Sequence, residues 1–204
     1  DPAAIPHLLQ AAATAEDRIL QHSLTYALIE LADADATRAG LASDQPRTVA
    51  AALIALDQMP GDNLTADDVL KNLDAADSQL SAAANWVVTH HAGWGGQLAD
   101  WFAEKLATLP PAAPRLSDTE APPTDDPSAR LVKMLAAFAG DANIRTLIAA
   151  TVQDASASPA ARFASLRAME QAAPIKNQAW PAALAAILDS GEQSLHAPAL
   201  AAVR

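Results

Sequence analysis

Hydrophobic residues recur along most of the chain with the three- and four-residue spacing of amphipathic α-helices. One such face is formed by Leu80, Ala83, Ala84, Val87 and Val88. No stretch of the sequence alternates with the period of two that a half-buried strand requires. The pattern predicts an all-α protein with helices over residues 3–13, 17–32, 36–43, 46–58, 66–74, 78–91, 96–108, 128–139, 143–154, 159–172, 180–189 and 194–203.

Several of these helices have recognisable N-terminal caps in the sequence. Two of them carry a Thr three residues before an Asp, which is a variant of the capping box. Two others begin with a capping residue followed by Pro, which is favoured at the first helical position. The four predicted starts are Thr65 with Asp68, Thr14 with Asp17, Ser158 with Pro159, and Asp126 with Pro127.

The predicted helices form pairs, and the second members of the pairs resemble one another. The segment 26–31 (YALIEL) overlays 51–56 (AALIAL), and 83–88 (AANWVV) follows at a similar interval. Later, 166–171 (LRAMEQ) overlays 198–203 (PALAAV). Spacings of this order are typical of two-helix repeats. They predict a HEAT-like α-α superhelix, or solenoid, of about six helix pairs in preference to a closed helix bundle.

A Pro-rich, acidic stretch at residues 109–127 interrupts the helical pattern. Proline removes backbone donors and restricts the residue before it, so this stretch is expected to be extended. The sequence therefore predicts HEAT-like pairs over 1–108, a loop or linker over 109–127, and further pairs over 128–204. A surface loop between neighbouring helices and a hinge between two halves are both compatible with this composition.

The charge is strongly acidic and unevenly distributed. The net charge is −11, and residues 1–108 hold five basic and fifteen acidic side chains, whereas residues 128–204 hold seven basic and five acidic. Such a chain repels a phosphate backbone, which argues against nucleic-acid binding. The acidic half is expected to attract a basic protein surface. Because no apolar run approaches about 18 residues, membrane insertion is not expected.

The sequence provides no recognisable metal or cofactor site. The chain has no Cys, which excludes thiolate ligands, cysteine nucleophiles and covalent haem attachment. His90 and His91 are adjacent, and neighbouring helical residues point about 100° apart, so the pair cannot chelate one ion alone. A site would need His22 or Asp57 to fold close to them, and the spacing gives no reason to expect that. We predict no metal and no cofactor.

Three tryptophans suggest an alternative to a pure interaction role. Trp86, Trp94 and Trp101 lie close in sequence and would form an aromatic pocket for a small molecule if they met in space. The glycines around Trp94 are typical of a helix–helix turn and lack the Lys and Ser/Thr of a phosphate-binding loop. No Gly-x-Ser-x-Gly or comparable catalytic frame occurs, so no catalytic residue is predicted.

Parts of the sequence resemble known helical-repeat proteins. Residues 44–56 and 158–169 are similar to the second-helix pattern of HEAT repeats. Residues 17–31, 51–59 and 91–95 resemble the HEAT region of planctomycete-type haem-binding CxxCH proteins. Those are large exported bacterial proteins in which a propeller domain resembling sugar dehydrogenases precedes the HEAT region and a c-type cytochrome domain follows.

The resemblance implies a connecting solenoid within a larger redox protein, in a periplasmic or otherwise extracytoplasmic location. The start at Asp1-Pro2, without an initiator Met, agrees with an excised fragment. Because this chain has no Cys-x-x-Cys-His motif, haem binding and dehydrogenase activity do not transfer to it. The implied partners are neighbouring domains of the same polypeptide or another protein.

The functional hypothesis is a non-catalytic HEAT-like interaction or spacer module. Second helices line the concave side of a HEAT solenoid, and there the sequence offers His22, Tyr26, Asn85 and His90 as candidate binding residues. The alternative is small-molecule binding at the tryptophan cluster. A third possibility, an enzyme like the HEAT-like chromophore lyases, has no supporting set of residues beyond fold analogy.

Overall fold

A computed structural model of the chain describes residues 1–110, 126–172 and 179–203, and these residues form twelve α-helices and no strand. The predicted all-α class is therefore confirmed. Two compact units are present, Asp1–His91 and Ala92–Arg204. The helix predicted at 96–108 belongs to the second unit, although the sequence prediction grouped it with the first half. Most of the predicted loop or linker at 109–127 lies outside the described residues.

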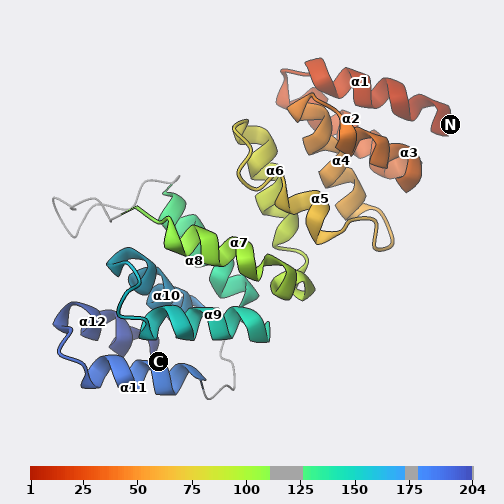
Figure 1. Cartoon of the computed structure of the whole chain (residues 1–204). Helices are drawn as coiled ribbons and strands as arrows, with labels where there is room; N and C mark the ends of the chain where they lie inside the picture. Colours follow the sequence, from red (N-terminus) through yellow and green to blue (C-terminus); the bar gives the residue numbers. More distant parts are fainter. Residues whose placement is uncertain (111–125, 173–178, 204) are drawn as a thin grey trace. The chain divides into compact units, whose positions relative to one another are not determined.

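The first unit contains six α-helices and two short 3-10 helices (Figure 1). Helix α4 lies at its centre and packs against α1, α2, α3 and α6. The elements are η1 (Pro2–Ala4), α1 (Ile5–Thr14), α2 (Arg18–Leu31), α3 (Ala34–Arg38), η2 (Ala39–Ala42), α4 (Pro46–Gln58), α5 (Ala66–Leu70) and α6 (Ser78–Val88).

Helix α4 can occupy this central place because small residues cover much of its surface. Every residue from Thr48 to Leu53 is buried, and four of these six are Ala or Thr. The Thr48 hydroxyl donates a buried hydrogen bond to the Leu9 carbonyl of α1 at 3.0 Å. On the other side, a Cβ at Gly40 would lie 2.8 Å from both Ala52 and Leu9, so only glycine permits this approach of η2.

The helices α2, α4 and α6 lie side by side in that order, with α4 in contact with both neighbours. They are the second members of the three predicted helix pairs in this unit. The first members α1 and α3 contact one another on the other side of α4. The unit therefore has two layers, and α2, α4 and α6 form one of them.

Aspartates at helix N-termini account for part of the acidic charge. Asp17, Asp33 and Asp77 are N-caps whose carboxylates accept backbone N–H groups of the first turn. The predicted capping box of Thr65 and Asp68 is confirmed at α5. The predicted box of Thr14 with Asp17 is wrong, because Thr14 is the last residue of α1, where its hydroxyl donates to the Ala11 carbonyl.

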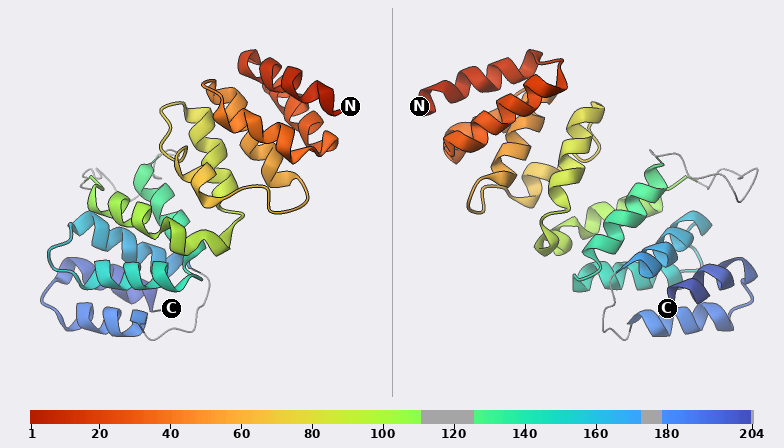
Figure 2. Two further views of the ribbon diagram at one scale, coloured as in Figure 1. Left: turned by 45° about the vertical axis from the view of Figure 1, so that its right-hand side comes forward. Right: turned by 180° about the vertical axis from the view of Figure 1, so that it is seen from behind.

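The second unit repeats the two-layer packing with the six α-helices that its described residues form. Helix α9 contacts α7 and α11 in one layer, and α10 contacts α8 and α12 in the other (Figure 2). The elements are η3 (Ala92–Trp94), α7 (Gly95–Ala107), α8 (Pro127–Phe138), α9 (Ala142–Gln153), α10 (Pro159–Gln171), α11 (Ala179–Asp189) and α12 (Gln193–Ala202). The predicted starts at Asp126-Pro127 and Ser158-Pro159 are confirmed as N-cap and first helical residue.

The core of the second unit is more aromatic than that of the first. Phe102 and Phe138 are fully buried, with ring centroids 5.9 Å apart. Arg162 is also buried, and its guanidinium donates to the Val152 carbonyl and to the Glu192 carboxylate. This arrangement ties the start of α10 to the end of α9 and to the N-cap residue of α12. A buried cation is tolerated here because its donors are paired.

The capping box at α5 gives a pH-dependent contribution to stability. Partial burial acts to raise the pKa of Asp68, but hydrogen bonds from Thr65 and Arg38 outweigh it and hold that pKa below its ordinary value. Ionised Asp68 therefore stabilises the first unit above about pH 4, and this contribution is lost as the pH falls through the lowered pKa.

Replacing Asp68 with Asn should lower the free energy of unfolding of the first unit by about 1 kcal/mol near neutral pH, because the cap and the Arg38 pair lose a charged acceptor. The difference from the unmodified chain should shrink as the pH falls below about 4. Denaturant unfolding followed by the NMR signal of the Trp86 indole measures it, since Trp86 is the one tryptophan in residues 1–91. The exposed neighbour Asp67→Asn is the matched control. If the difference in the free energy of unfolding stayed constant with pH, the ionised Asp68 carboxylate would not be the source of the stabilisation.

Candidate functional site

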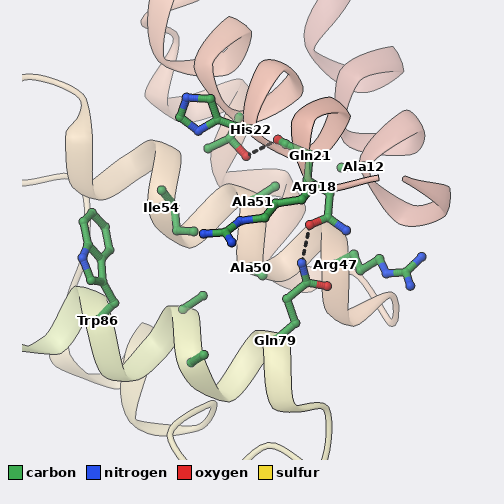
Figure 3. A pocket seen from close by; sticks show the side chains of 13 residues that line it. Ala12, Arg18, Gln21, His22, Arg47, Ala50, Ala51, Ile54, Gln79 and Trp86 are labelled. Carbon is green, nitrogen blue, oxygen red and sulfur yellow. Dashed lines mark hydrogen bonds between the residues drawn. The ribbon is translucent and has the colours of Figure 1, made fainter. Parts of the chain in front are cut away.

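Three helices of the first unit present matching stripes of side chains to a common cavity of about 440 Å³ (Figure 3). Within each helix the lining residues are three or four positions apart, so they lie on one face. The stripes are Arg18, Gln21, His22 and Thr25 on α2, Arg47, Ala50, Ala51 and Ile54 on α4, and Gln79, Ala82, Ala83 and Trp86 on α6, with Ala12 of α1 completing the lining.

A second cavity of about 480 Å³ continues the first toward the C-terminal ends of the same helices. The two cavities share four lining residues, His22, Thr25, Ile54 and Trp86, and the second adds Tyr26, Ile29 and Gln58. We call this continuous depression the second-helix groove. Its floor is α4, and its walls are α2 and α6.

The polar end of the groove is bridged by amide groups from its two walls. The Gln79 side chain of α6 donates to the Gln21 side-chain oxygen of α2 (Figure 3). The Gln21 side chain in turn donates to the Ala15 carbonyl at 2.7 Å, which fixes its orientation. The small side chains of Ala50 and Ala51 on the floor leave the space beneath this bridge open.

Several N–H donors in the groove have no acceptor in the part of the chain that the structure describes. Neither guanidinium of Arg18 and Arg47 has a hydrogen-bond or ion-pair partner among the described residues. The same holds for the indole N–H of Trp86, whose side chain is 44% exposed. Figure 3 shows the Arg18 side chain extending across the cavity, whereas that of Arg47 points away from Trp86. The groove thus combines an apolar floor with unpaired positive and neutral donors.

The Trp86 ring is held in place by a buried carboxylate at the ends of α4 and α6. The Trp86 and His90 rings meet edge to face with centroids 4.2 Å apart. His90 Nδ1 and His91 Nε2 each lie 2.8 Å from an oxygen of Asp57, whose side chain is only 1% exposed. Because an ionised carboxylate can only accept, these two ring nitrogens carry the hydrogens. Asp57 thereby positions both histidines, and His90 supports one face of the groove.

This arrangement corrects one step of the sequence argument. The spacing gave no reason to expect Asp57 near the two histidines, yet the fold brings all three together. Their contacts are those of an intramolecular hydrogen-bond cluster. In the part of the chain that the structure describes, no group of three or more His, Asp or Glu side chains has a geometry that could hold a metal ion.

Tyr26 contributes a hydroxyl at the apolar end of the groove. A hydrogen bond with the Glu30 carboxylate, together with the charge of Glu30, raises the pKa of Tyr26 above its ordinary value. The phenol is therefore neutral across the physiological pH range. Its ring is 55% exposed and remains available for contact with a ligand.

The four predicted binding residues have different locations. His22 and Tyr26 line the groove, His22 in both cavities and Tyr26 in the second. Asn85 is half-buried on α6, where its amide donates to the Leu73 and Ser81 carbonyls at 3.2 and 2.7 Å. Asn85 and His90 are not among the residues that line the groove, and both have intramolecular hydrogen bonds that support α6.

The predicted tryptophan cluster is divided between the two units. Trp86 belongs to the first unit, whereas Trp94 and Trp101 belong to the second. Within the second unit the Trp101 ring lies edge to face on Phe102 with centroids 5.2 Å apart, and Lys105 Nζ lies 5.6 Å from the Trp101 ring centre. The cavities beside Trp86 are lined entirely by residues of the first unit.

Sequence reasoning missed the residues that give the groove its charge and its floor. Arg18, Arg47 and Gln79 were not proposed, although each is the first lining residue of its helix. Ile54 was also missed, and it occupies the same position on α4 as Trp86 on α6. Aligning the three second helices in sequence could have found these residues. On each helix, the lining residues are the first one and those three, four and seven positions after it. Comparing these positions across the copies would have identified the common face.

Comparison of the chain with family models and with curated proteins finds no match in either.

Among the described residues, no helix is both long enough and apolar enough to cross a membrane.

Replacing Asp57 with Ala should reduce the free energy of unfolding of the first unit by about 2 kcal/mol, because it removes the acceptor for His90, His91 and the Gln58 side chain. It should also shift the Trp86 indole NMR signal, since His90 loses its anchor. The control Asp62→Ala, at an exposed loop position, should change stability by less than about 0.5 kcal/mol. An unchanged Trp86 signal in the Asp57 variant would show that the cluster does not position the ring.

Proposed function

We propose that this chain is a non-catalytic, HEAT-like interaction module that binds a segment of a protein partner in the second-helix groove. The alternation of helices between two layers supports the HEAT-like arrangement. In the first unit α2, α4 and α6 share one layer, and in the second unit α8, α10 and α12 do the same. The twelve α-helices of the described residues would make six such pairs.

The observation that carries the proposal is the exposure of apolar surface along the groove. Trp86 and Tyr26 are 44% and 55% exposed, and they flank Ile54 and the alanines of the floor. Large aromatic side chains that remain exposed around an apolar floor are typical of binding surfaces. The donors of Arg18 and Trp86 add directional contacts that fix an occupant in one orientation.

A small molecule is the second candidate occupant, and the volume of the first cavity favours it, since ligand pockets are typically about 300–1,000 Å³. Such a ligand would use Trp86 without Trp94 or Trp101. We favour a protein segment because the lining extends from Arg18 to Ile29, about 16 Å along the axis of α2. That length suits several residues of a peptide.

The wider context that we propose rests on the sequence resemblance. The module would connect neighbouring domains of an extracytoplasmic redox protein, with a periplasmic or similar location. The acidic side chains of the first unit, which lie outside the groove, would attract a basic protein surface at long range. Residues 1–91 hold four basic and thirteen acidic side chains, so this attraction should weaken as salt rises from low to physiological strength.

Selection of a displayed twelve-residue random peptide library on the full chain tests the groove directly. We expect recovered peptides to bind at least tenfold more weakly to Trp86→Ala and to Ile54→Glu, because each change removes apolar contact in the groove. The matched control is Ile19→Ala, at a residue that is 75% exposed and lies outside both cavities. Affinities can be measured by fluorescence anisotropy with the labelled peptides.

Peptides that bind equally well to the unmodified chain and to both groove variants would refute the proposed site. Recovery of no peptide, together with millimolar-range binding of small aromatic compounds that is lost in Trp86→Ala, would instead support the small-molecule alternative.

A further inference from the structure

We propose that the occupant of the second-helix groove is an acidic peptide segment, with a large apolar side chain against Trp86 and Ile54 and carboxylates paired with Arg18 and Arg47. This inference rests on the proposed function and adds the chemical class of the partner. It differs from the long-range attraction of a basic surface, because it concerns the short-range chemistry of the groove itself.

The distribution of charge within the first unit is the first support. Residues 1–91 contain four basic side chains, and two of them, Arg18 and Arg47, line the groove. The thirteen acidic side chains of the same segment contribute none of the lining residues. The groove is therefore a cationic region on a unit that is otherwise strongly acidic.

The adjacent carboxylates are already engaged. Asp17, which precedes Arg18, is the N-cap of α2 and accepts the Ile19 amide at 3.1 Å. Glu30, which lies near the other end of the groove, interacts with the Tyr26 hydroxyl. In contrast, Arg38, outside the groove, is paired with Asp68. Arg18 and Arg47 have no such partner among the described residues, and an incoming carboxylate would supply an acceptor.

The hydrogen-bonding character of the groove is the second support. Its unpaired groups include the guanidiniums of Arg18 and Arg47 and the Trp86 indole, all of which can only donate. The Gln21 amide is occupied on both its oxygen and its nitrogen. A segment rich in acceptors satisfies such a surface, whereas a Lys- or Arg-rich segment would place donors against donors and like charges together.

The spacing of the two ends sets the length of the segment. Arg18 and Ile29 are eleven residues apart on α2, which corresponds to about 16 Å along the helix axis. An extended peptide covers this distance with about five residues, and a helical one with about three turns. The part of the partner that occupies the groove therefore has about this length.

The experiment uses the peptides selected for dependence on Trp86 and Ile54. We expect these peptides to be enriched in Asp and Glu together with Trp, Phe or Leu. Arg18→Glu in the full chain should weaken the tightest of them about ten- to hundredfold. Lys71→Glu is the matched control: it makes the same change of charge at an exposed position of the first unit outside the groove, and it should alter affinity less than about threefold.

A charge swap separates a direct contact from a change in folding. Replacing the acidic residues of the peptide with Lys should abolish binding to the unmodified chain and restore part of it in the Arg18→Glu variant. Groove-dependent peptides that are basic or uncharged, or an equal effect of Arg18→Glu and Lys71→Glu, would overturn this inference and leave the groove as a binding site. If no recovered peptide depends on Trp86 and Ile54, the proposed function fails and the inference fails with it.

Discussion

The burial of helix α4 is the constraint on which the first unit depends. Because its residues Thr48–Leu53 are small or compact, α1, η2, α2 and α6 can all approach it closely. Gly40 and the Thr48 hydrogen bond to Leu9 fix its inner side. On its outer side Ala50 and Ala51 are too short to fill the space between α2 and α6, which leaves the groove. The same packing therefore stabilises the unit and shapes its candidate binding site.

Within that frame, polar interactions determine which side chains the groove presents. Asp57 holds His90 and His91, and His90 supports the Trp86 ring. Gln21 and Gln79 join the two walls. Most aspartates of this unit with described contacts act on the backbone or on neighbouring side chains, as Asp17, Asp33 and Asp77 do. Helix capping thus accounts for part of the acidity of this unit, and none of its acidic residues lines the groove.

The sequence was sufficient for the class of fold and for most helix positions, because apolar periodicity and capping residues are local signals. Thr65 with Asp68 and the two Pro-containing starts have their expected roles. Thr14 was misassigned because a helix end and a helix start are adjacent there. The groove was only half anticipated, through His22 and Tyr26. The positions of Arg18, Arg47 and Asp57 depend on which faces of α2, α4 and α6 meet, and that is decided by packing between segments far apart in the sequence.

We propose that one face of the first unit, built by α2, α4 and α6, is a preformed peptide-binding groove. The most direct measurement is an NMR titration of the full chain with a bound peptide, following backbone amide and indole signals. We expect the shifted signals to gather on Arg18, His22, Ile54 and Trp86. Shifts that gather instead around the separate cavity of about 380 Å³ lined by Gln10, Ala36 and Ser43 would contradict it.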